Sequence, residues 1–233
     1  MSRSLQRSTK QPPQKELRAI DALINQGQYL EAEEKARTLV EGYPRSGDAI
    51  GILGLTLVSQ AKYDEALPIL QKADASLPDK PAIMAALGLC LLVVGQPRMA
   101  RPLLERTLTL QPHRLAARTS LGDVYIVLGE VEKGRQCFQE NLRRDPLNIG
   151  AHYSLSNFIT YQPTNDIFKL LPPQLDNEAV SSKNKATVAF TLGKAYWDIG
   201  DTERAFEHYQ RGNELRKSLK ETLNLHEASG INT

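Results

Sequence analysis

A short stretch near the N-terminus, Tyr-Pro-Arg-Ser-Gly at residues 43–47, combines residue types that can bind an anion. The guanidinium of Arg45 is always charged, the hydroxyl of Ser46 can donate a hydrogen bond, and the first N–H groups of a following helix favour negative charge. A catalytic loop of this kind follows a β-strand and completes its phosphate contacts with further hydroxyl side chains. Here residues 31–40 have the pattern of a helix, and the charge of Asp48 would repel a phosphate. We therefore predict a turn between two helices.

The other side chains that could do chemistry are scattered along the chain. None of the four histidines has another histidine or a cysteine at metal-ligand spacing, and HExxH and CxxC motifs are absent; they are His113, His152, His208 and His226. Cys90 and Cys137 lie in apolar surroundings and are expected in the core. Neither GxGxxG nor GxxxxGKS occurs, and no Ser, His and acid form a recognisable nucleophile set. We expect no catalytic residue, no metal ligand and no cofactor, and hence no enzyme activity in this chain.

The composition is that of a globular protein. Of 233 residues, 41% are apolar and 24% are charged, so the chain can bury a core. The 29 basic and 27 acidic residues nearly balance, which argues against a dedicated nucleic-acid binder. No apolar run reaches the ~18 residues of a membrane span, the N-terminus lacks the apolar part of a secretory signal, and two cysteines are too few for a disulfide framework. We expect a cytoplasmic protein whose residues 1–12 form a flexible arm.

A period of 34 residues runs through most of the chain. Proline recurs at this spacing, at Pro44, Pro78, Pro112 and Pro146. The pair Leu-Gly recurs at 53–54, 87–88 and 121–122, and alanine recurs at Ala32, Ala66 and Ala100. Glycine keeps the same step at Gly27, Gly95 and Gly129, with Ala61 in the remaining slot. A period of this length indicates an array of helical repeats.

Each recurring residue has a physical role in a pair of antiparallel helices. The glycine of Leu-Gly lets the first helix approach the second closely, because a Cβ would hold them apart, and the alanine is small at the same crossing. Gly95 and Gly129 can end the first helix in a left-handed conformation, and proline ends the second helix because it cannot continue it. No single pair buries its apolar face, so pairs must stack. The sequence predicts an all-α fold, a right-handed α-solenoid of stacked antiparallel helix pairs with about six repeat units.

The pattern resembles the tetratricopeptide repeat, whose signature over 34 residues is W-x2-L-G-x2-Y, then A-x3-F, then P. The fourth repeat shows it best, with Leu121, Gly122, Tyr125, Gly129, Phe138 and Pro146. The resemblance implies four regular repeats over residues 13–148, at roughly 13–46, 47–80, 81–114 and 115–148. The first is the least regular, as a capping repeat would be.

The register slips after Pro146. A first helix begins at Ala151, but Pro163 and the pair at 172–173 forbid a complete second helix, so residues 149–185 are predicted to form an irregular unit with a proline-rich insertion. That insertion is either a tolerated loop or a bend in the solenoid. The pattern returns in residues 186–226 as a final repeat. Its second helix, N-capped at Asp201 or Thr202 and free of proline, is expected to be long and to cover the open end of the stack, with residues 227–233 as a tail.

The final repeat is similar to the end of the repeat region in bacterial tetratricopeptide–sulfotransferase proteins. The matching residues are Phe190, Gly193, Lys194, Asp198, Gly200, Ala205, Phe206, His208, Gly212, Asn213 and Leu215. In that family a catalytic domain follows, with a Pro-Arg-Ser-Gly-Thr-Thr loop for the 3′-phosphosulfate donor. Residues 44–47 carry the first letters of that loop, but in the position of an inter-repeat turn. The resemblance implies either a stand-alone relative or the substrate-recruiting repeat region of a longer sulfotransferase-like protein.

The resemblance to tetratricopeptide repeats also implies that the first helix of each repeat lines a concave groove. In the second to fourth repeats this groove is mostly small and aliphatic, and it lacks the Lys/Asn/Arg clamp with which chaperone-binding members hold a peptide carboxylate. An apolar groove favours an amphipathic helix or an apolar peptide, unless these residues pack between neighbouring helices. The later units add aromatic and polar residues typical of binding hot spots, including Tyr161. The predicted binding residues are Leu55, Leu89, Leu92, Asp123, Ile126, Tyr153, Asn157, Phe190, Lys194 and Trp197.

The preferred function is a scaffold that binds a protein or peptide through its concave face, without nucleic acid and without a membrane span. The alternative from a different class is the substrate-recruiting repeat region of a sulfotransferase-like protein whose catalytic domain is absent from this chain. Self-association is a third hypothesis, in which the N-terminal arm or the terminal helix of another copy fills the groove.

Overall fold

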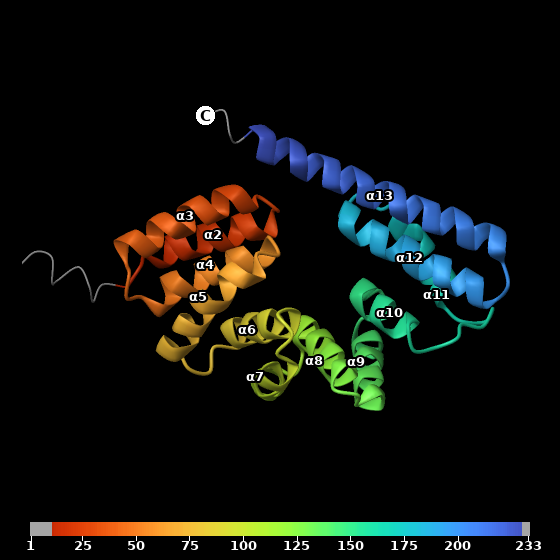
Figure 1. The fold of residues 1–233 in the computed structure, drawn as a ribbon, viewed down its shortest axis with the longest axis horizontal. Coiled ribbons are helices and arrows are strands. Elements are labelled where there is room, and N and C mark those ends of the chain that lie inside the picture. The colour runs from red at the N-terminus through yellow and green to blue at the C-terminus, as the bar shows by residue number, and fades with distance from the viewer. Residues whose placement is uncertain (1–10, 230–233) are drawn as a thin grey trace, which may run out of the picture. The chain divides into compact units, whose positions relative to one another are not determined.

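The computed structural model describes residues 11–229, with side chains as far as residue 221. These residues form twelve α-helices, α2 to α13, and one short 3-10 helix, and they contain no strand. The predicted all-α fold, an α-solenoid of antiparallel helix pairs, is confirmed (Figure 1). The chain divides into two compact units, Met1–Gly134 and Arg135–Thr233.

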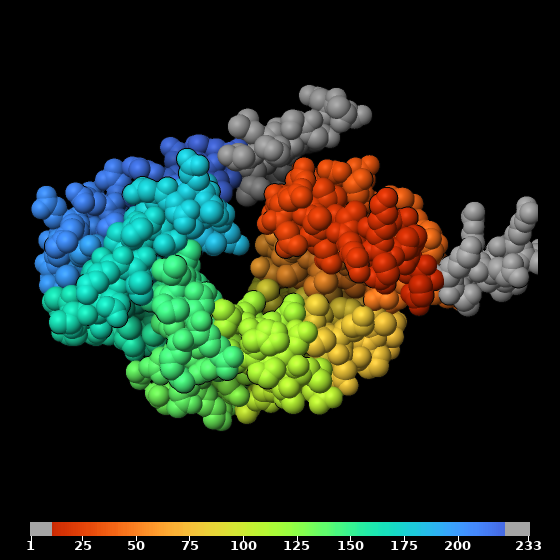
Figure 2. Space-filling view, turned by 180° about the vertical axis from the view of Figure 1, so that it is seen from behind, coloured from red at the N-terminus to blue at the C-terminus, as the bar shows by residue number. Residues whose placement is uncertain are grey.

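The first unit is built from consecutive helix pairs. Its helices are α2 (Gln14–Asn25) and α3 (Tyr29–Gly42), α4 (Gly47–Ser59) and α5 (Tyr63–Ser76), α6 (Pro81–Val93) and α7 (Pro97–Leu110), then α8 (Leu115–Val127) and the start of α9 (Val131–Arg144). Within each of the first three pairs the two helices pack against each other, and the first helices of successive pairs also pack in a row, α2 on α4, α4 on α6 and α6 on α8. Figure 2 shows that side chains fill the space between these pairs.

Glycine permits the close approach of the two helices in a pair, as the sequence predicts. A Cβ added at Gly54 would lie 2.6 Å from Cδ2 of Leu70, and one added at Gly88 would lie 2.7 Å from Cγ of Leu104. Leu70 and Leu104 are completely buried, so neither can move aside into solvent. The Leu-Gly spacing is therefore a steric requirement of the helix crossing.

The turn inside each pair is a left-handed cap. Gly27, Gly95 and Gly129 have φ of 75°, 77° and 82°, and Ala61 occupies the same slot with φ of 60°. In each turn the residue after the cap donates its N–H to a carbonyl five positions earlier, as Gln96 does to Leu91 at 2.7 Å. This pattern is the Schellman motif, which satisfies carbonyls that the end of a helix leaves unpaired. Ala61 adopts this conformation at a steric cost that glycine would avoid.

Residues 43–46 form the predicted turn between two helices, α3 and α4, and Gly47 is the first residue of α4. The Ser46 hydroxyl caps α4 by accepting a hydrogen bond from the Ala49 N–H at 3.4 Å, and it donates to Gln11 Oε1 at 3.0 Å. Ser46 is 5% exposed. Its hydroxyl is therefore already used by the fold.

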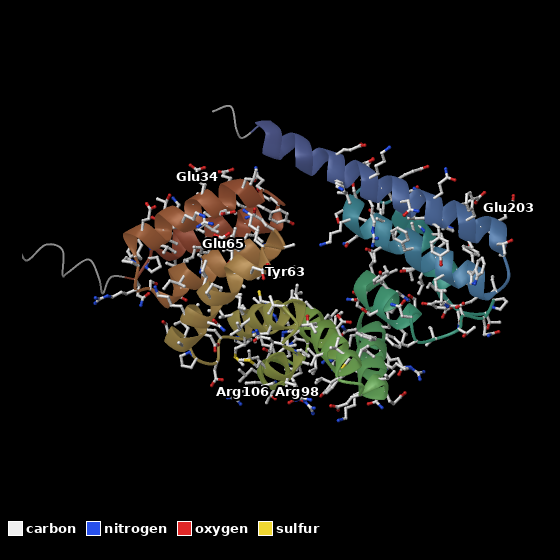
Figure 3. The ribbon with its side chains drawn as sticks, viewed as in Figure 1. Glu34, Tyr63, Glu65, Arg98, Arg106 and Glu203 are labelled. Atoms are coloured by element: carbon white, nitrogen blue, oxygen red, sulfur yellow. The ribbon has the colours of Figure 1, made fainter. Side chains whose placement is uncertain are left out.

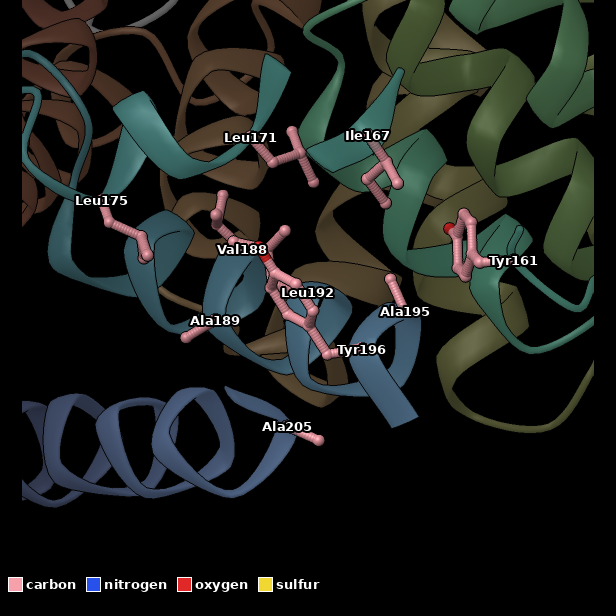
Figure 4. Packing of buried hydrophobic residues seen from close by; sticks show 10 residues of the cluster. All are labelled: Tyr161, Ile167, Leu171, Leu175, Val188, Ala189, Leu192, Ala195, Tyr196 and Ala205. Atoms are coloured by element: carbon pink, nitrogen blue, oxygen red, sulfur yellow. The ribbon is translucent and has the colours of Figure 1, made fainter. Parts of the chain in front are cut away.

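The second unit keeps one complete helix pair. It contains the remainder of α9, α10 (Ile149–Ser156), α11 (Ile167–Leu170), a 3-10 helix at Pro172–Leu175, α12 (Ser182–Asp198) and α13 (Thr202–Ser229). In place of a second helix after α10 there are only the four residues of α11 and the 3-10 turn, because Pro172 and Pro173 cannot continue an α-helix. The side chains of this irregular segment pack on α12 in one apolar cluster (Figure 4).

The final helix begins where the sequence predicts. The Asp201 carboxylate accepts a hydrogen bond from the Arg204 N–H at 3.1 Å and so caps α13. With 28 residues, α13 is longer than its partner α12, which has 17. The 227–233 tail lies outside the described residues except for 227–229, which belong to α13.

The predicted flexible arm, residues 1–12, lies outside the described residues except for its last two. Of these, Gln11 accepts the hydrogen bond from Ser46, and Pro12 is buried. Among residues 11–229, no helical segment combines the length and hydrophobicity that crossing a bilayer requires.

A hydrogen-bond network joins the first two helix pairs. Glu33 of α3 accepts hydrogen bonds from Lys62 Nζ at 2.7 Å and Gln60 Nε2 at 2.6 Å, both in the turn between α4 and α5, and from Arg37 Nε at 2.8 Å. Burial alone would raise the pKa of Glu33, but these donors outweigh it and lower the pKa from 4.5 to about 2. The carboxylate therefore stabilises the contact between successive pairs in its charged form.

We expect Gly88→Ala to destabilise the fold by about 1–3 kcal/mol, because the new methyl group would overlap Leu104. Gly42→Ala is the matched control. It lies in α3 with no atom within 4 Å of the added Cβ, so it should be neutral or stabilise by up to about 1 kcal/mol. Urea denaturation followed by circular dichroism measures both, and equal effects of the two substitutions would contradict the steric account.

We also expect the stability advantage of the wild type over Glu33→Gln to depend on pH. Because the folded pKa of about 2 lies below 4.5, the advantage is fully present above pH 4.5 and is lost as pH falls toward 2. Its size at neutral pH should be about 1–2 kcal/mol, since Lys62 and Arg37 are partly exposed. Denaturation of both proteins between pH 7 and pH 3 provides the measurement, and a difference that grows as pH falls would exclude this role.

Candidate functional site

The two sets of helices in the first unit carry different side chains. On the second helices, charged side chains such as Glu34 of α3 and Arg98 and Arg106 of α7 point outward (Figure 3). By contrast α6, a first helix, contains no charged residue, and its only side chain with a polar hydrogen is the buried Cys90. The first helices α4, α6 and α8 therefore present a mainly apolar surface.

This surface, which we call the first-helix face, consists of Leu55, Val58, Leu89, Leu92, Val93, Ile126 and Val127. Val93 and Val127 are 51% and 62% exposed and hold equivalent positions at the ends of α6 and α8. The other members are half-buried. Ile126 has an additional contact inside its own pair, because a Cβ at Gly134 of α9 would lie 2.6 Å from Ile126 Cδ1.

The predicted residues of the first unit thus fall on one face. Leu55, Leu89, Leu92 and Ile126 belong to the first-helix face, and Asp123 lies on the same helix as Ile126 and is half-buried. Val93 and Val127 are the most exposed apolar side chains of this face. The repeat register places both on the concave side, at equivalent positions 34 residues apart, although they are not among the predicted binding residues.

In the second unit, three of the predicted residues are exposed. Tyr153 and Asn157 lie on and just after α10, and Trp197 lies near the end of α12, where it is 62% exposed. The helices α10 and α12 pack against each other. Tyr153, Asn157 and Trp197 are therefore available to a partner.

Phe190, by contrast, is engaged by the helix that follows. A Cβ at Gly212 of α13 would lie 3.0 Å from the Phe190 ring, and the ring also meets Tyr209 at 6.4 Å between centroids. Arg216, which also belongs to α13, has its guanidinium 4.3 Å from the centroid of the Phe190 ring. These contacts place Phe190 between α12 and α13, so we leave it out of the candidate binding surface.

Lys194 also has a partner within its own helix. Its ammonium lies 2.5 Å from both carboxylate oxygens of Asp198, one turn further along α12. Asp198 in turn accepts a hydrogen bond from the backbone N–H of Tyr161 at 3.0 Å. The pair fastens the segment after α10 to α12, and we leave Lys194 out of the binding surface too.

Tyr161 corrects the sequence interpretation. It was predicted among the exposed aromatic residues, but it is 4% exposed and belongs to the apolar cluster with Ile167, Leu171 and Leu192 (Figure 4). The physical reason is that α10 ends at Ser156 and the chain turns back, where the hydrogen bond to Asp198 holds Tyr161 against α12. Burial raises the pKa of its hydroxyl.

The residue that gives the final repeat its particular character, His208, has a packing role. Its ring stacks on the Tyr196 ring, with the two centroids 5.2 Å apart and an interplanar angle of 4°. The guanidinium of Arg204 lies 4.5 Å from the centroid of the same Tyr196 ring. Burial and, to a smaller extent, the nearby Arg211 lower the pKa of His208. His208, Phe190 and Lys194, three of the residues that carry the resemblance, therefore have contacts within the final repeat.

The described side chains give no sign of catalytic chemistry. Burial raises the pKa of the Cys90 thiol to about 11, so this thiol stays protonated at neutral pH and is a poor nucleophile. Cys137 is half-buried, less than the core position predicted for it. No group of three His, Cys, Asp or Glu side chains among residues 11–221 is arranged to hold a metal ion.

Comparisons with known proteins agree with this architecture. Family models described as tetratricopeptide repeat match residues 17–81, 84–149 and 186–219. No curated protein sequence matches the chain. The similarity to sulfotransferase repeat regions is not shown by these matches.

Two solved structures illustrate the similarity in fold. MamA from Desulfovibrio magneticus RS-1 is 19% identical with a TM-score of 0.52, over 88% of this chain and 95% of that one. YrrB, described as a TPR protein with an unusual peptide-binding site, is 19% identical with a TM-score of 0.52, over 84% of this chain and 90% of that one. At these identities the similarity establishes the fold.

We expect Asp198→Ala to destabilise the protein by about 2–4 kcal/mol, because it leaves the Tyr161 N–H without its acceptor and Lys194 without its counterion. Trp197→Ala, at the adjacent exposed position, should change stability by less than about 0.5 kcal/mol. Thermal unfolding of both variants distinguishes the roles. A larger effect at Trp197 than at Asp198 would show that the assignment is wrong.

Proposed function

Because the chain belongs to the tetratricopeptide repeat family, we propose that it is a protein-interaction scaffold whose first-helix face binds a helix or peptide of a partner protein. The observation that carries this proposal is the exposure of Val93 and Val127 at equivalent positions of neighbouring helices, beside the half-buried leucines at 55, 89 and 92. YrrB, which has the same fold, is described as having a peptide-binding site. That description supports a binding role for repeats of this kind.

The physical argument concerns apolar area. Contiguous apolar surface that stays in water costs free energy, and its burial by a partner contributes roughly 25 cal/mol for each Å² removed from water. Side chains on the first helices are held in place by the helix pairs beneath them, so a ligand does not have to order them. A rigid apolar face is therefore suited to bind the apolar side of a partner.

The exposed residues of the second unit form a further proposed contact site, consisting of Tyr153, Asn157 and Trp197. Aromatic side chains contribute large contact area at low conformational cost, which is why they dominate many interfaces. Trp197, as the single tryptophan of the chain, also reports binding there by its fluorescence.

The sulfotransferase-related alternative rests on the resemblance of residues 190–215 alone. Phe190, Lys194 and His208 have packing or ion-pair contacts within the final repeat, and no observation on this chain favours that alternative over the scaffold. Sequencing the gene beyond the codon for Thr233 tests it, because the alternative requires a downstream Pro-Arg-Ser-Gly-Thr-Thr loop. That the protein is cytoplasmic, that it does not bind nucleic acid and that it can associate with itself were inferred from the sequence, and these three points stay predictions.

The test of the scaffold proposal compares matched exposed substitutions. The face variant, Val93→Glu with Val127→Glu, places two charges on the first-helix face. The control variant, Leu30→Glu with Met99→Glu, places two charges on the second helices, at apolar side chains that are 64% and 56% exposed. Immobilised wild type and both variants are incubated with extract of the source cells, and captured proteins are quantified by mass spectrometry. We expect proteins whose recovery falls at least about tenfold with the face variant only.

Circular dichroism first establishes that both variants are folded. If the face variant recovers the same proteins in the same amounts as the wild type, the first-helix face is not the binding surface.

A further inference from the structure

Position nine of the four regular repeats forms a row with acids at its ends. The residues are Asp21, Leu55, Leu89 and Asp123, each 34 positions after the one before, on α2, α4, α6 and α8. These four helices pack side by side in that order. The row therefore runs across the first unit as acid, leucine, leucine, acid.

The charge of this surface has one sign. At positions 2, 5, 9, 12 and 13 of the four repeats, which tetratricopeptide repeats direct to the concave side, the only charged residues are Asp21, Asp48 and Asp123. The helices α4, α6 and α8 contain one basic residue, Arg118. It is buried and donates a hydrogen bond to the carbonyl of Pro112. Lys15 and Arg18 of α2 occupy other positions of that helix.

Asp21 is an exposed carboxylate that forms no hydrogen bond or ion pair with a described residue. Partial desolvation by its surroundings raises its pKa. Asp48, in contrast, has Lys80 Nζ at 3.5 Å. The charge of Asp21 would therefore attract a cation brought by a ligand.

The ligand should satisfy its own backbone. An extended peptide exposes N–H and C=O groups that need partners once water is excluded. The middle of the row is α6, whose positions on this side are Ala82, Ala85, Leu89, Leu92 and Val93, and none of these side chains can form a hydrogen bond. A helix, whose backbone groups bond internally, avoids this penalty.

The spacing of the packed helices sets the length of the ligand. Adjacent packed helices lie about 8–10 Å apart, so the three steps from α2 to α8 cover about 25–30 Å. A helix with a rise of 1.5 Å per residue covers this distance in about 17–20 residues.

We infer that the first-helix face binds an amphipathic helix of about 20 residues whose apolar side lies on Leu55 and Leu89 and whose two ends carry Lys or Arg, facing Asp21 and Asp123. This inference rests on the proposed binding function and adds the chemistry of the ligand. A helix with acidic ends would meet like charge at both ends of the row and bind more weakly.

The test uses three labelled peptides of about 20 residues that share one leucine-rich face and carry two lysines, two glutamines or two glutamates at each end. Fluorescence anisotropy measures their dissociation constants with the full chain. We expect the lysine peptide to bind about tenfold more tightly than the glutamate peptide at low salt, and the difference to shrink as salt is raised.

Two charge-matched variants locate the effect. Asp21→Asn with Asp123→Asn should remove the preference for lysine ends. Glu34→Gln with Glu41→Gln, which removes the same charge from exposed positions of α3, should keep it.

The outcomes separate this inference from the proposal on which it rests. If all three peptides bind equally and Val93→Glu with Val127→Glu abolishes binding, the face binds helices but the charge inference is overturned. A lysine preference that survives in the Asp21 and Asp123 variant and disappears in the Glu34 and Glu41 variant overturns it as well. Binding of no peptide contradicts both the inference and the proposed function.

Discussion

The close approach of two antiparallel helices at a glycine is the constraint on which the rest of this structure depends. Leu70, Leu104 and Tyr209 pack directly over Gly54, Gly88 and Gly193. A Cβ added at any of these glycines would lie 2.6–2.9 Å from the facing side chain, which would then have to move. This contact fixes how each first helix lies on its second helix. Because the second helix covers one side, the opposite side of the first helix is left for the neighbouring pair and for solvent. The apolar face on α4, α6 and α8 is a consequence of that arrangement.

The second unit shows what happens when the pairing is interrupted. After α10 the chain lacks a second helix, and the apolar side of α12 would be exposed without a substitute. Ile167, Leu171 and Leu175 provide that substitute from short segments, and Asp198 anchors the returning chain through the Tyr161 N–H. Arg211 of α13 adds a hydrogen bond to the Leu175 carbonyl at 3.2 Å. The irregular segment thus covers α12 as a second helix otherwise would.

The sequence predicts the features that are set by local backbone constraints. It does not predict the surroundings of side chains that contact segments distant in the sequence. Proline, glycine and alanine at a fixed period report where a helix must end, turn or approach another, so the helix pairs and the Asp201 cap could be predicted. The surroundings of Phe190 depend on which face of α13 reaches it, and the burial of Tyr161 depends on how the chain returns after α10. Neither is encoded in residues close by in the sequence. The ion pair of Lys194 is local, since Asp198 lies one helical turn further along α12, and this spacing could be read from the sequence.

The account of function depends on one claim, that partners contact the first-helix face of residues 1–134. Site-specific photo-crosslinking inside the source cells tests it most directly. A photoreactive phenylalanine analogue is introduced at position 93 or 127 on this face, or at position 30 on the second helix α3, and crosslinked products are identified by mass spectrometry. The account predicts the same partner protein crosslinked from 93 and 127 and not from 30. Crosslinks from position 30 with none from 93 and 127 would contradict it.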